Sequence, residues 1–314
     1  MHSTSKSSCL LSRLAIGLLV LVTASLNAVH AATLSFEDLW PGDSDKDFND
    51  QVLQYNFAGT VNTFGQFTDL HASVSVLAIG SSIHNGVYLH LPVPTPLFSS
   101  ATLDIGQGPG TVSAEAGESQ LVVQLVADTR QLYGPNTGFI NTDPSLPRVP
   151  VAPPMQLDIH FATPVTLDLS QAPFDLFIAR TGDRSHEIHL PQYGGTAHMN
   201  TSLFNTGVDA STPGRHFIDQ KGLPFALDVP SIAIPPSDPN LAVWPKESVP
   251  IDLVYPQIVS FAASGGTAAT DWYNFPNTQY LYAVPEPSTF VLGGLGLVGL
   301  IAAARRRQAS VIRR

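Results

Sequence analysis

Short stretches in which apolar and polar residues alternate, separated by turns rich in glycine and proline, constrain the fold of this chain more than any other feature. Alternation with a period of two is typical of β-strands that bury one face. The clearest stretches are residues 72–79, 87–91, 121–126, 157–161 and 165–169. The 24 glycines and 26 prolines supply the turns. We therefore predict an all-β, β-sandwich-like fold, built as one sandwich or as two packed β-subdomains, with few short helices.

Two further segments bear on the organisation of the chain. Residues 251–263 are compatible with one helix that ends at Ser264, Gly265 and Gly266, since glycine stops helices. The proline-rich stretch 143–154 is either a linker between two domains or a long loop between sheets. We expect residues 32–280 to form the β-rich domain, and 143–154 is where it would divide.

The charge of the chain is distributed unevenly. The formal net charge is −10, but seven of the 15 basic residues and only one of the 25 acidic residues lie outside residues 32–284. This leaves eight basic and 24 acidic residues in the body, a net charge of −16. Because phosphate repels such a body, we expect no nucleic-acid partner. The excess of acid gives solubility, and it also suits an exported protein that meets divalent cations.

Residues 1–31 have the features of a secretory signal peptide. Lys6 and Arg13 form a positively charged region, and residues 14–26 form an apolar run. Small residues follow, so we predict cleavage between Ala31 and Ala32. The alternative is an uncleaved membrane anchor, for which the run is shorter than the roughly 20 apolar residues that span a bilayer.

Residues 284–314 contain a proline-rich motif, an apolar segment and an arginine cluster. They comprise Pro285, Glu286 and Pro287, a predicted transmembrane helix over 288–304, and Arg305, Arg306 and Arg307. This tail resembles the PEP-CTERM sorting signal of Gram-negative bacteria. The resemblance implies that an exosortase, a membrane protease, cuts the tail at the inner membrane and that the protein then reaches the cell surface or the medium. It also implies a bacterium that makes exopolysaccharide and biofilm. The alternative is a C-terminal anchor that is retained.

An acidic segment near the start of the predicted domain is the clearest candidate for a binding site. Its oxygen-bearing side chains are those of Asp43, Asp45, Asp47, Asn49 and Asp50. Calcium binds six to eight oxygen ligands, and carboxylates this close repel one another without a cation. The spacing begins like an EF-hand loop, but Phe48 replaces the required glycine and Gln54 the final glutamate. We therefore predict a Ca²⁺ site of another kind; the alternative is a solvated acidic turn.

A second resemblance extends over most of the body. The segments that carry it are 36–50, 78–86, 187–191, 203–207, 223–230, 244–247, 251–256, 264–266 and 271–273. Together they resemble the LruC-domain proteins, which are related to the DUF4842 family. The chain departs from the family at 231–241, which looks inserted, and at Asp45 and Lys46, where the family loop is often shorter. The resemblance implies a bacterial surface or extracellular protein and no particular reaction.

Signatures of known enzyme classes are absent from the sequence. There is no nucleophile elbow, zinc-protease motif, phosphate-binding loop or dinucleotide-binding glycine motif. His186 and His189 lie three apart, which places them on opposite faces of a strand and separates them as zinc ligands. We therefore predict a non-enzymatic, calcium-stabilised protein of the surface or extracellular matrix. The alternatives are a carbohydrate-binding module anchored to exopolysaccharide and, less well supported, a secreted hydrolase.

Overall fold

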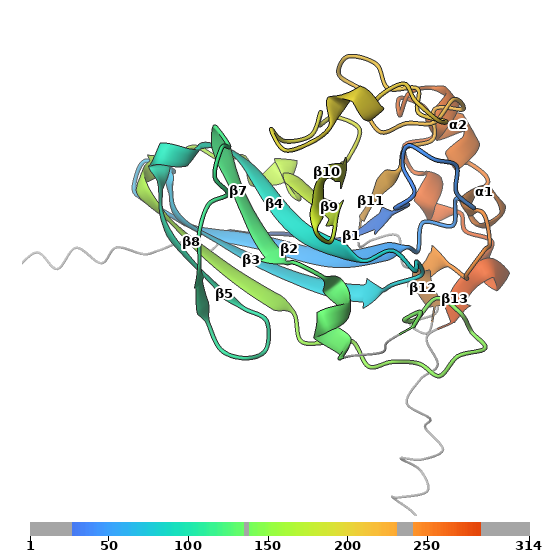
Figure 1. Cartoon of the computed structure of the whole chain (residues 1–314), viewed down its shortest axis with the longest axis horizontal. Helices are drawn as coiled ribbons and strands as arrows, with labels where there is room; N and C mark the ends of the chain where they lie inside the picture. Colours follow the sequence, from blue (N-terminus) through green and yellow to red (C-terminus); the bar gives the residue numbers. More distant parts are fainter. Residues whose placement is uncertain (1–26, 135–137, 231–240, 284–314) are drawn as a thin grey trace, which may run out of the picture.

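Two antiparallel β-sheets packed face to face form most of the structure (Figure 1). The computed structural model describes residues 27–134, 138–230 and 241–283. The larger sheet has seven strands in the order β11-β1-β2-β3-β8-β5-β6. Its strands are β1 (Asn27–Phe36), β2 (Gln51–Val61), β3 (Phe67–Ala78), β5 (Phe98–Asp104), β6 (Gly110–Val112), β8 (Met155–Val165) and β11 (Ala226–Pro230).

The smaller sheet has the order β10-β9-β4-β7, and a separate pair is formed by β12 and β13. These strands are β4 (Asn85–Pro94), β7 (Gln120–Val126), β9 (Asp175–Arg180), β10 (Asp183–Ile188), β12 (Leu241–Pro245) and β13 (Leu281–Ala283). The described α-helices are α1 (Ile251–Val254) and α2 (Ile258–Ala263). Short 3₁₀ turns are η1 (Thr95–Leu97), η2 (Thr129–Tyr133), η3 (Leu169–Gln171), η4 (Thr201–Leu203), η6 (Trp272–Asn274) and η7 (Thr278–Tyr280).

Inward-facing side chains of the two sheets meet in one hydrophobic core. Leu34, Phe57 and Leu70 of the larger sheet and Leu89 and Ile178 of the smaller sheet belong to it, and all five are fully buried. Period-two alternation places every second side chain of a strand on the same face, so these residues gather between the sheets. The prediction of an all-β, sandwich-like fold is confirmed.

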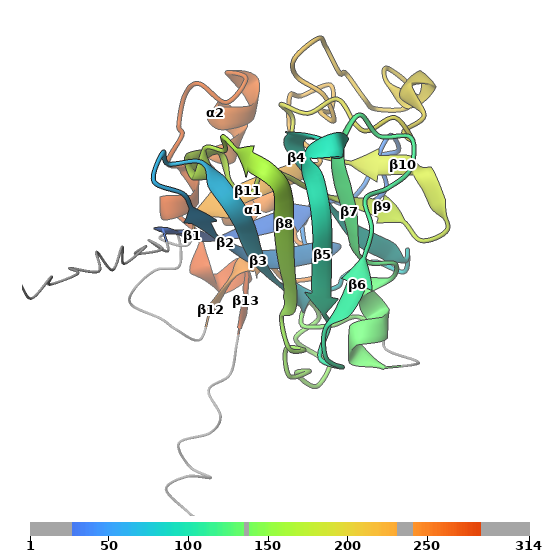
Figure 2. The same cartoon turned by 90° about the vertical axis from the view of Figure 1, so that its left-hand side faces the viewer.

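The outer face of the larger sheet is partly covered and partly exposed. Near β1 and β11 it is covered by the C-terminal segment, which Figure 2 shows beside that edge of the sheet. Val254 and Trp272 of this segment share a buried cluster with Val229 of β11. Farther along the sheet the face is polar, and β3 and β8 pair His71 with Asp158 and Asp69 with His160 across the strands.

The structure corrects two sequence predictions. Residues 165–169 are not a strand of their own, because Val165 ends β8 and Leu169 begins η3. The single helix predicted over 251–263 is divided into α1 and α2. Pro256 has no N–H and disfavours helical geometry in the residue before it, and Tyr255 is indeed extended at φ −124° and ψ 78°.

The structure bears on two boundaries suggested by the sequence: the proline-rich stretch and the start of the domain. The proline-rich stretch 143–154 lies between β7 of the smaller sheet and β8 of the larger sheet, and β8 pairs with β3 and β5 from before the stretch, so the stretch is a loop between two sheets that pack together. Strand β1 begins at Asn27, and the predicted cleavage site between Ala31 and Ala32 therefore lies within it. After cleavage there, residues 32–36 would still pair with both β2 and β11.

Among the described residues, no helix is long and apolar enough to cross a membrane. The predicted transmembrane helix over 288–304 lies outside these residues, as does most of the predicted signal peptide.

A buried charge network covers the outer face of the smaller sheet. The His189 ring is fully buried, and its nitrogens lie 2.7 Å from Asp175 Oδ1 and 2.8 Å from Glu187 Oε2. Although burial opposes the charged form, the two carboxylates outweigh it and raise the pKa of His189 to about 9. His186 is only half-buried and pairs with Asp183. The two histidines therefore have different roles, as their spacing predicts.

Replacing His189 with leucine should destabilise the protein strongly, because Asp175 and Glu187 would lose the buried imidazolium between them and keep, within the described part of the chain, only His90 and Arg184 as basic partners. The expected loss is about 3–5 kcal/mol of unfolding free energy, measured by urea denaturation at neutral pH. His186→Ala is the matched control and should change stability by no more than about 0.5 kcal/mol. Equal small effects in the two variants would show that His189 is not a structural cation.

Candidate metal centre

The connection between β1 and β2, residues 37–50, folds back over the end of the larger sheet. In Figure 1 this connection lies against the C-terminal segment that carries α1 and α2. Trp40 anchors its first half, donating from Nε1 to Asp209 Oδ1 at 2.7 Å. Its second half is bent by Lys46 and Phe48, which adopt positive φ values of 61° and 54°. Such values are uncommon outside glycine and cluster at functional sites.

This bend brings three carboxylates together. Glu37, Asp45 and Asp47 each place an oxygen within 4.8 Å of the other two. Glu37 and Asp47 are buried, at 0% and 1% exposure, whereas Asp45 reaches the surface. Two carboxylates removed from water and a third at the rim form a pocket of negative charge that opens to solvent on one side.

Several buried oxygens around this cluster make no hydrogen bond among the described residues. They are Glu37 Oε2, Asn49 Oδ1, Glu247 Oε2 and the Ser44 hydroxyl. The other oxygen of Glu37 accepts from the Phe48 N–H, so one half of that carboxylate is satisfied and one is not. A buried acceptor without a partner costs free energy, so either a proton or a bound cation would stabilise these oxygens.

The pKa values of the two buried carboxylates also reflect the cost of burying their charge. Burial raises the pKa of Glu37 to about 7. Burial, with the nearby Glu37 and Asp45 charges, raises the pKa of Asp47 to about 8. Both carboxylates would therefore hold protons near neutral pH unless a cation stabilised their charged forms.

Asp50 faces a neighbouring group rather than the cluster itself. Its Oδ2 accepts from the Asp38 N–H at 2.8 Å, while Asp38 accepts from Ser81 and Asn85. Burial, followed by the Asp38 charge, raises the pKa of Asp50 to about 10, and burial also raises that of Asp38. Asp50 is thus an acid that keeps its proton beside Asp38.

The five residues predicted as calcium ligands therefore separate in the structure. Asp45 and Asp47 come together, and Asn49 supports Asp47 through its backbone N–H and its amide Nδ2. Asp50 turns to Asp38, and Asp43 is exposed, with its carboxylate 3.8 Å from Lys46 Nζ. The predicted ligand set stays a prediction, and the geometry favours only part of it.

Two acidic residues of the cluster were not predicted from the sequence. Glu37 directly follows β1, and Glu247 lies about 200 residues later, after β12. Glu37 could have been recognised from the sequence, because the alternating pattern of β1 places it directly after the end of a buried strand. No local pattern identifies Glu247, which tertiary folding alone brings close.

Two features hold the acidic loop in place. The Asn49 carbonyl accepts from the Gly80 N–H at 2.9 Å, and a side chain at position 80 would collide with Asn49 Oδ1, so only glycine fits there. From the C-terminal segment, the Ser248 N–H donates to Asp47 Oδ2 at 2.7 Å, and the Ile251 N–H donates to the Lys46 carbonyl at 2.8 Å.

The donor set fits a hard divalent cation. Several carboxylates are available, and a cavity of about 430 Å³ beside them gives water room to complete the shell; its polar lining includes Asp38, Asp43, Ser44, Asp45, Asp50 and Glu247. Calcium accepts this mixture of ligands and tolerates irregular geometry, whereas zinc prefers nitrogen and sulfur. The residues present therefore fit Ca²⁺.

Two parts of the chain match known protein families. The family model described as "Domain of unknown function (DUF4842)" matches residues 65–273, and the PEP-CTERM protein-sorting motif matches residues 283–307. A solved structure of a candidate lipoprotein from Bacteroides ovatus is similar, with 18% identity and a TM-score of 0.57. The similarity covers 82% of this chain and 75% of that protein, and it concerns the fold. No curated protein matches the chain.

In the absence of divalent cations, stability should fall as pH rises from about 6 to 9. A carboxyl whose folded-state pKa is raised binds more protons in the folded than in the unfolded chain, so its cost grows until pH exceeds the folded pKa. Asp47→Asn should reduce this slope and stabilise the protein at about pH 8.5 by on the order of 1 kcal/mol.

The measurement is urea unfolding of wild type and Asp47→Asn in EDTA across this pH range. The contribution of His189, which is also lost as pH approaches its pKa of about 9, is common to both proteins and cancels in the difference. Parallel stability curves would contradict a raised pKa at Asp47.

Proposed function

The chain belongs to the DUF4842 family and carries a PEP-CTERM protein-sorting motif, and from this premise we propose that it is a non-enzymatic, calcium-stabilised protein of the cell surface or extracellular matrix. In this proposal an exosortase removes the tail at the inner membrane. The processed domain then remains at the surface or enters the medium.

The observation that carries the proposal is the position of the sorting motif. It matches from residue 283, where the last described strand, β13, ends. Cleavage near Pro285, Glu286 and Pro287 would therefore remove the tail without removing a strand from the sheets. The acidic body, with its net charge of −16, also fits an environment that contains divalent cations.

Calcium is proposed for the cluster of Glu37, Asp45 and Asp47, with Glu247 Oε2 as a further oxygen donor, while Asn49 supports Asp47 through its amide nitrogen. What supports it is the buried, unpartnered oxygen of Glu37 beside carboxylates whose pKa values are raised. A cation would satisfy these oxygens, and it would join the β1–β2 connection to the C-terminal segment that supplies Glu247 and Ser248.

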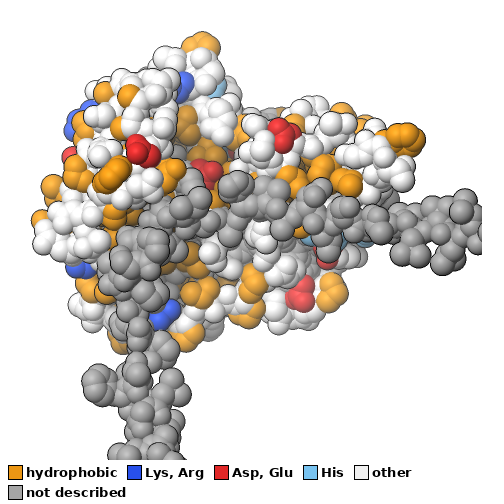
Figure 3. Space-filling model, turned by 180° about the vertical axis from the view of Figure 1, so that it is seen from behind, with side chains coloured by type: hydrophobic (Ala, Val, Ile, Leu, Met, Phe, Trp, Pro, Cys, Tyr) orange, Lys and Arg blue, Asp and Glu red, His pale blue; other side chains and the backbone are white. Residues whose placement is uncertain are grey.

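Exopolysaccharide is the partner that such a location would offer. The exposed polar face of the larger sheet, with Asp69, His71, Asp158 and His160, supplies hydrogen-bonding groups for it. On the face seen in Figure 3, charged side chains lie singly among hydrophobic and uncharged ones. The tryptophans Trp40, Trp244 and Trp272 are buried, so sugar stacking on them does not support a carbohydrate-binding module.

Intact-mass analysis of the extracellular protein tests the export part of the proposal. The expected species begins near Ala32 and ends near Pro285, Glu286 and Pro287, and a strain without exosortase should accumulate the longer form. An extracellular protein that retains Arg305, Arg306 and Arg307 would contradict tail processing.

Thermal unfolding with and without calcium tests the metal part. Ligand that binds only the folded state stabilises it by about 2.7 kcal/mol at a hundredfold excess over Kd, so wild-type protein should melt several degrees higher in millimolar Ca²⁺ than in EDTA. Asp47→Ala should lose this response.

Asp43→Ala is the matched control from the same loop. Because Asp43 is exposed and lies outside the three-carboxylate cluster, although it lines the adjoining cavity, this variant should keep more of the calcium response than Asp47→Ala. If the melting temperature of the wild-type protein does not rise in millimolar calcium, the calcium proposal is wrong. A response lost equally in both variants would instead support a site formed by the whole acidic segment.

A further inference from the structure

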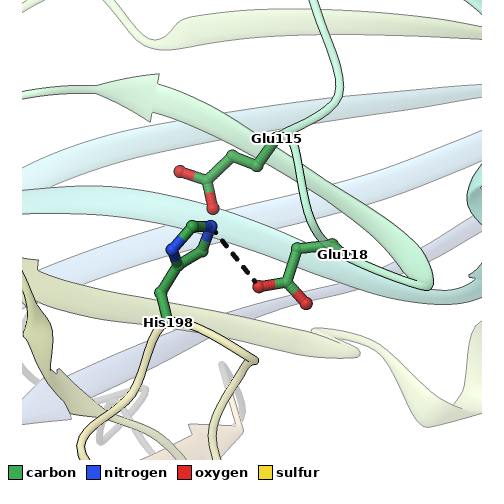
Figure 4. Close-up of side chains that lie close together, drawn as sticks. All are labelled: Glu115, Glu118 and His198. Atoms are coloured by element: carbon green, nitrogen blue, oxygen red, sulfur yellow. Dashed lines mark ion pairs between the residues drawn. The ribbon is translucent and has the colours of Figure 1, made fainter.

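Two loops beside the smaller sheet bring two glutamates and a histidine together (Figure 4). Glu115 and Glu118 lie between β6 and β7, and His198 lies between β10 and η4. One donor atom from each residue lies within 4.8 Å of the other two. Since about 80 residues separate the histidine from the glutamates, no sequence motif marks this cluster.

The spacing of the donor atoms suits a small ion between them. His198 Nε2 lies 3.7 Å from Glu118 Oε1, which exceeds a normal hydrogen bond. Two ligands bound at ~2.0–2.2 Å to one tetrahedral ion lie roughly 3.4 Å apart. Nε2 also lies 3.2 Å from the Ala116 carbonyl. In the absence of metal Nε2 donates to that carbonyl, so binding an ion through Nε2 requires the imidazole to carry its proton at Nδ1 and to give up this hydrogen bond.

Each carboxylate is oriented by a partner outside the cluster. Arg184 donates to both oxygens of Glu115, from Nη2 to Oε2 at 2.6 Å and from Nε to Oε1 at 3.2 Å, and the Ala197 N–H lies 3.0 Å from Glu118 Oε1 and 3.3 Å from Oε2. A carboxylate oxygen has further lone pairs, so these bonds leave room for a metal. Arg184 also pairs with the fully buried Glu187, and its charge is therefore shared between two carboxylates. Outer partners of this kind are usual around metal ligands.

Both loops are held rigidly. Met199, next to His198, is 6% exposed and belongs to the hydrophobic core, and Gly195 has a φ of 87° and no room for a side chain against Met199. On the other loop, the Thr95 hydroxyl donates to the Glu118 carbonyl at 2.9 Å. Ligands on supported backbone lose little freedom on binding a metal.

We propose that Glu115, Glu118 and His198 form a second metal site, selective for zinc or a similar borderline divalent ion. One imidazole with two carboxylates suits zinc, whereas calcium prefers a shell made only of oxygen. The His198 side chain is 40% exposed, so the remaining coordination position faces solvent. The ion would cross-link the β6–β7 loop to the segment after β10.

Zinc titration of the purified protein tests this site independently of the calcium proposal. The protein is stripped with EDTA, returned to excess Ca²⁺ so that the acidic loop is saturated, and titrated with Zn²⁺ by calorimetry. We expect one Zn²⁺ per chain at micromolar concentration. Co²⁺ in place of Zn²⁺ should give the visible absorption of a tetrahedral complex.

Three variants decide the outcome. His198→Ala and Glu118→Gln should each weaken Zn²⁺ binding at least about tenfold. His160→Ala, which removes an exposed histidine on the larger sheet, should leave it unchanged. His198 is exposed, and an unchanged melting temperature in EDTA confirms that its variant folds. The proposal is overturned if wild type does not bind Zn²⁺, if His198→Ala binds it as wild type does, or if His160→Ala abolishes binding.

Discussion

The burial of carboxylates where the two ends of the domain meet is the constraint that the acidic loop has to satisfy. Glu37 directly follows β1, and Asp47 lies beside it in the β1–β2 connection. Both side chains are buried. The C-terminal segment closes over them through the Ser248 and Ile251 N–H groups. Because isolated buried charges are costly, this closure requires either protons on the carboxylates or a cation between them.

The buried charges on the outer face of the smaller sheet are instead paired with one another within the chain. Around His189, the carboxylates of Asp175 and Glu187 are balanced by the fully buried imidazolium together with the Arg184 guanidinium, which pairs with Glu187, so the network is complete within the chain. Near Glu37 the closest basic side chain is that of Lys46, whose ammonium lies over the Phe225 ring and toward Asp43. One network is therefore neutralised internally, and the other depends on what the surrounding solution supplies. Because of this contrast, the calcium site is proposed at the acidic loop and not at the His189 network.

The sandwich itself could be predicted because its cause is local. Alternation along residues 72–79, 87–91, 121–126 and 157–161 assigns one face of each strand to the core, and β3, β4, β7 and β8 follow. The same local pattern failed over 165–169, where the chain turns into η3 instead of continuing. It also failed at Pro256, whose effect on Tyr255 divided a helix that apolar spacing alone made continuous. Which strands pair, and that 143–154 runs between the two sheets, depended on contacts between distant segments.

The sequence alone determined the all-β class, the sorting tail and the presence of an acidic segment suited to a hard cation. Strand periodicity, a membrane-directed tail and oxygen density are all properties of neighbouring residues. Tertiary structure alone decided which acids meet. It turned Asp50 toward Asp38, left Asp43 in solvent, and added Glu37 and Glu247 to Asp45 and Asp47. It also joined Glu115 and Glu118 to His198. A metal site is defined by distances of a few ångströms between donor atoms, and only folding sets those distances when the donors lie on separate strands and loops.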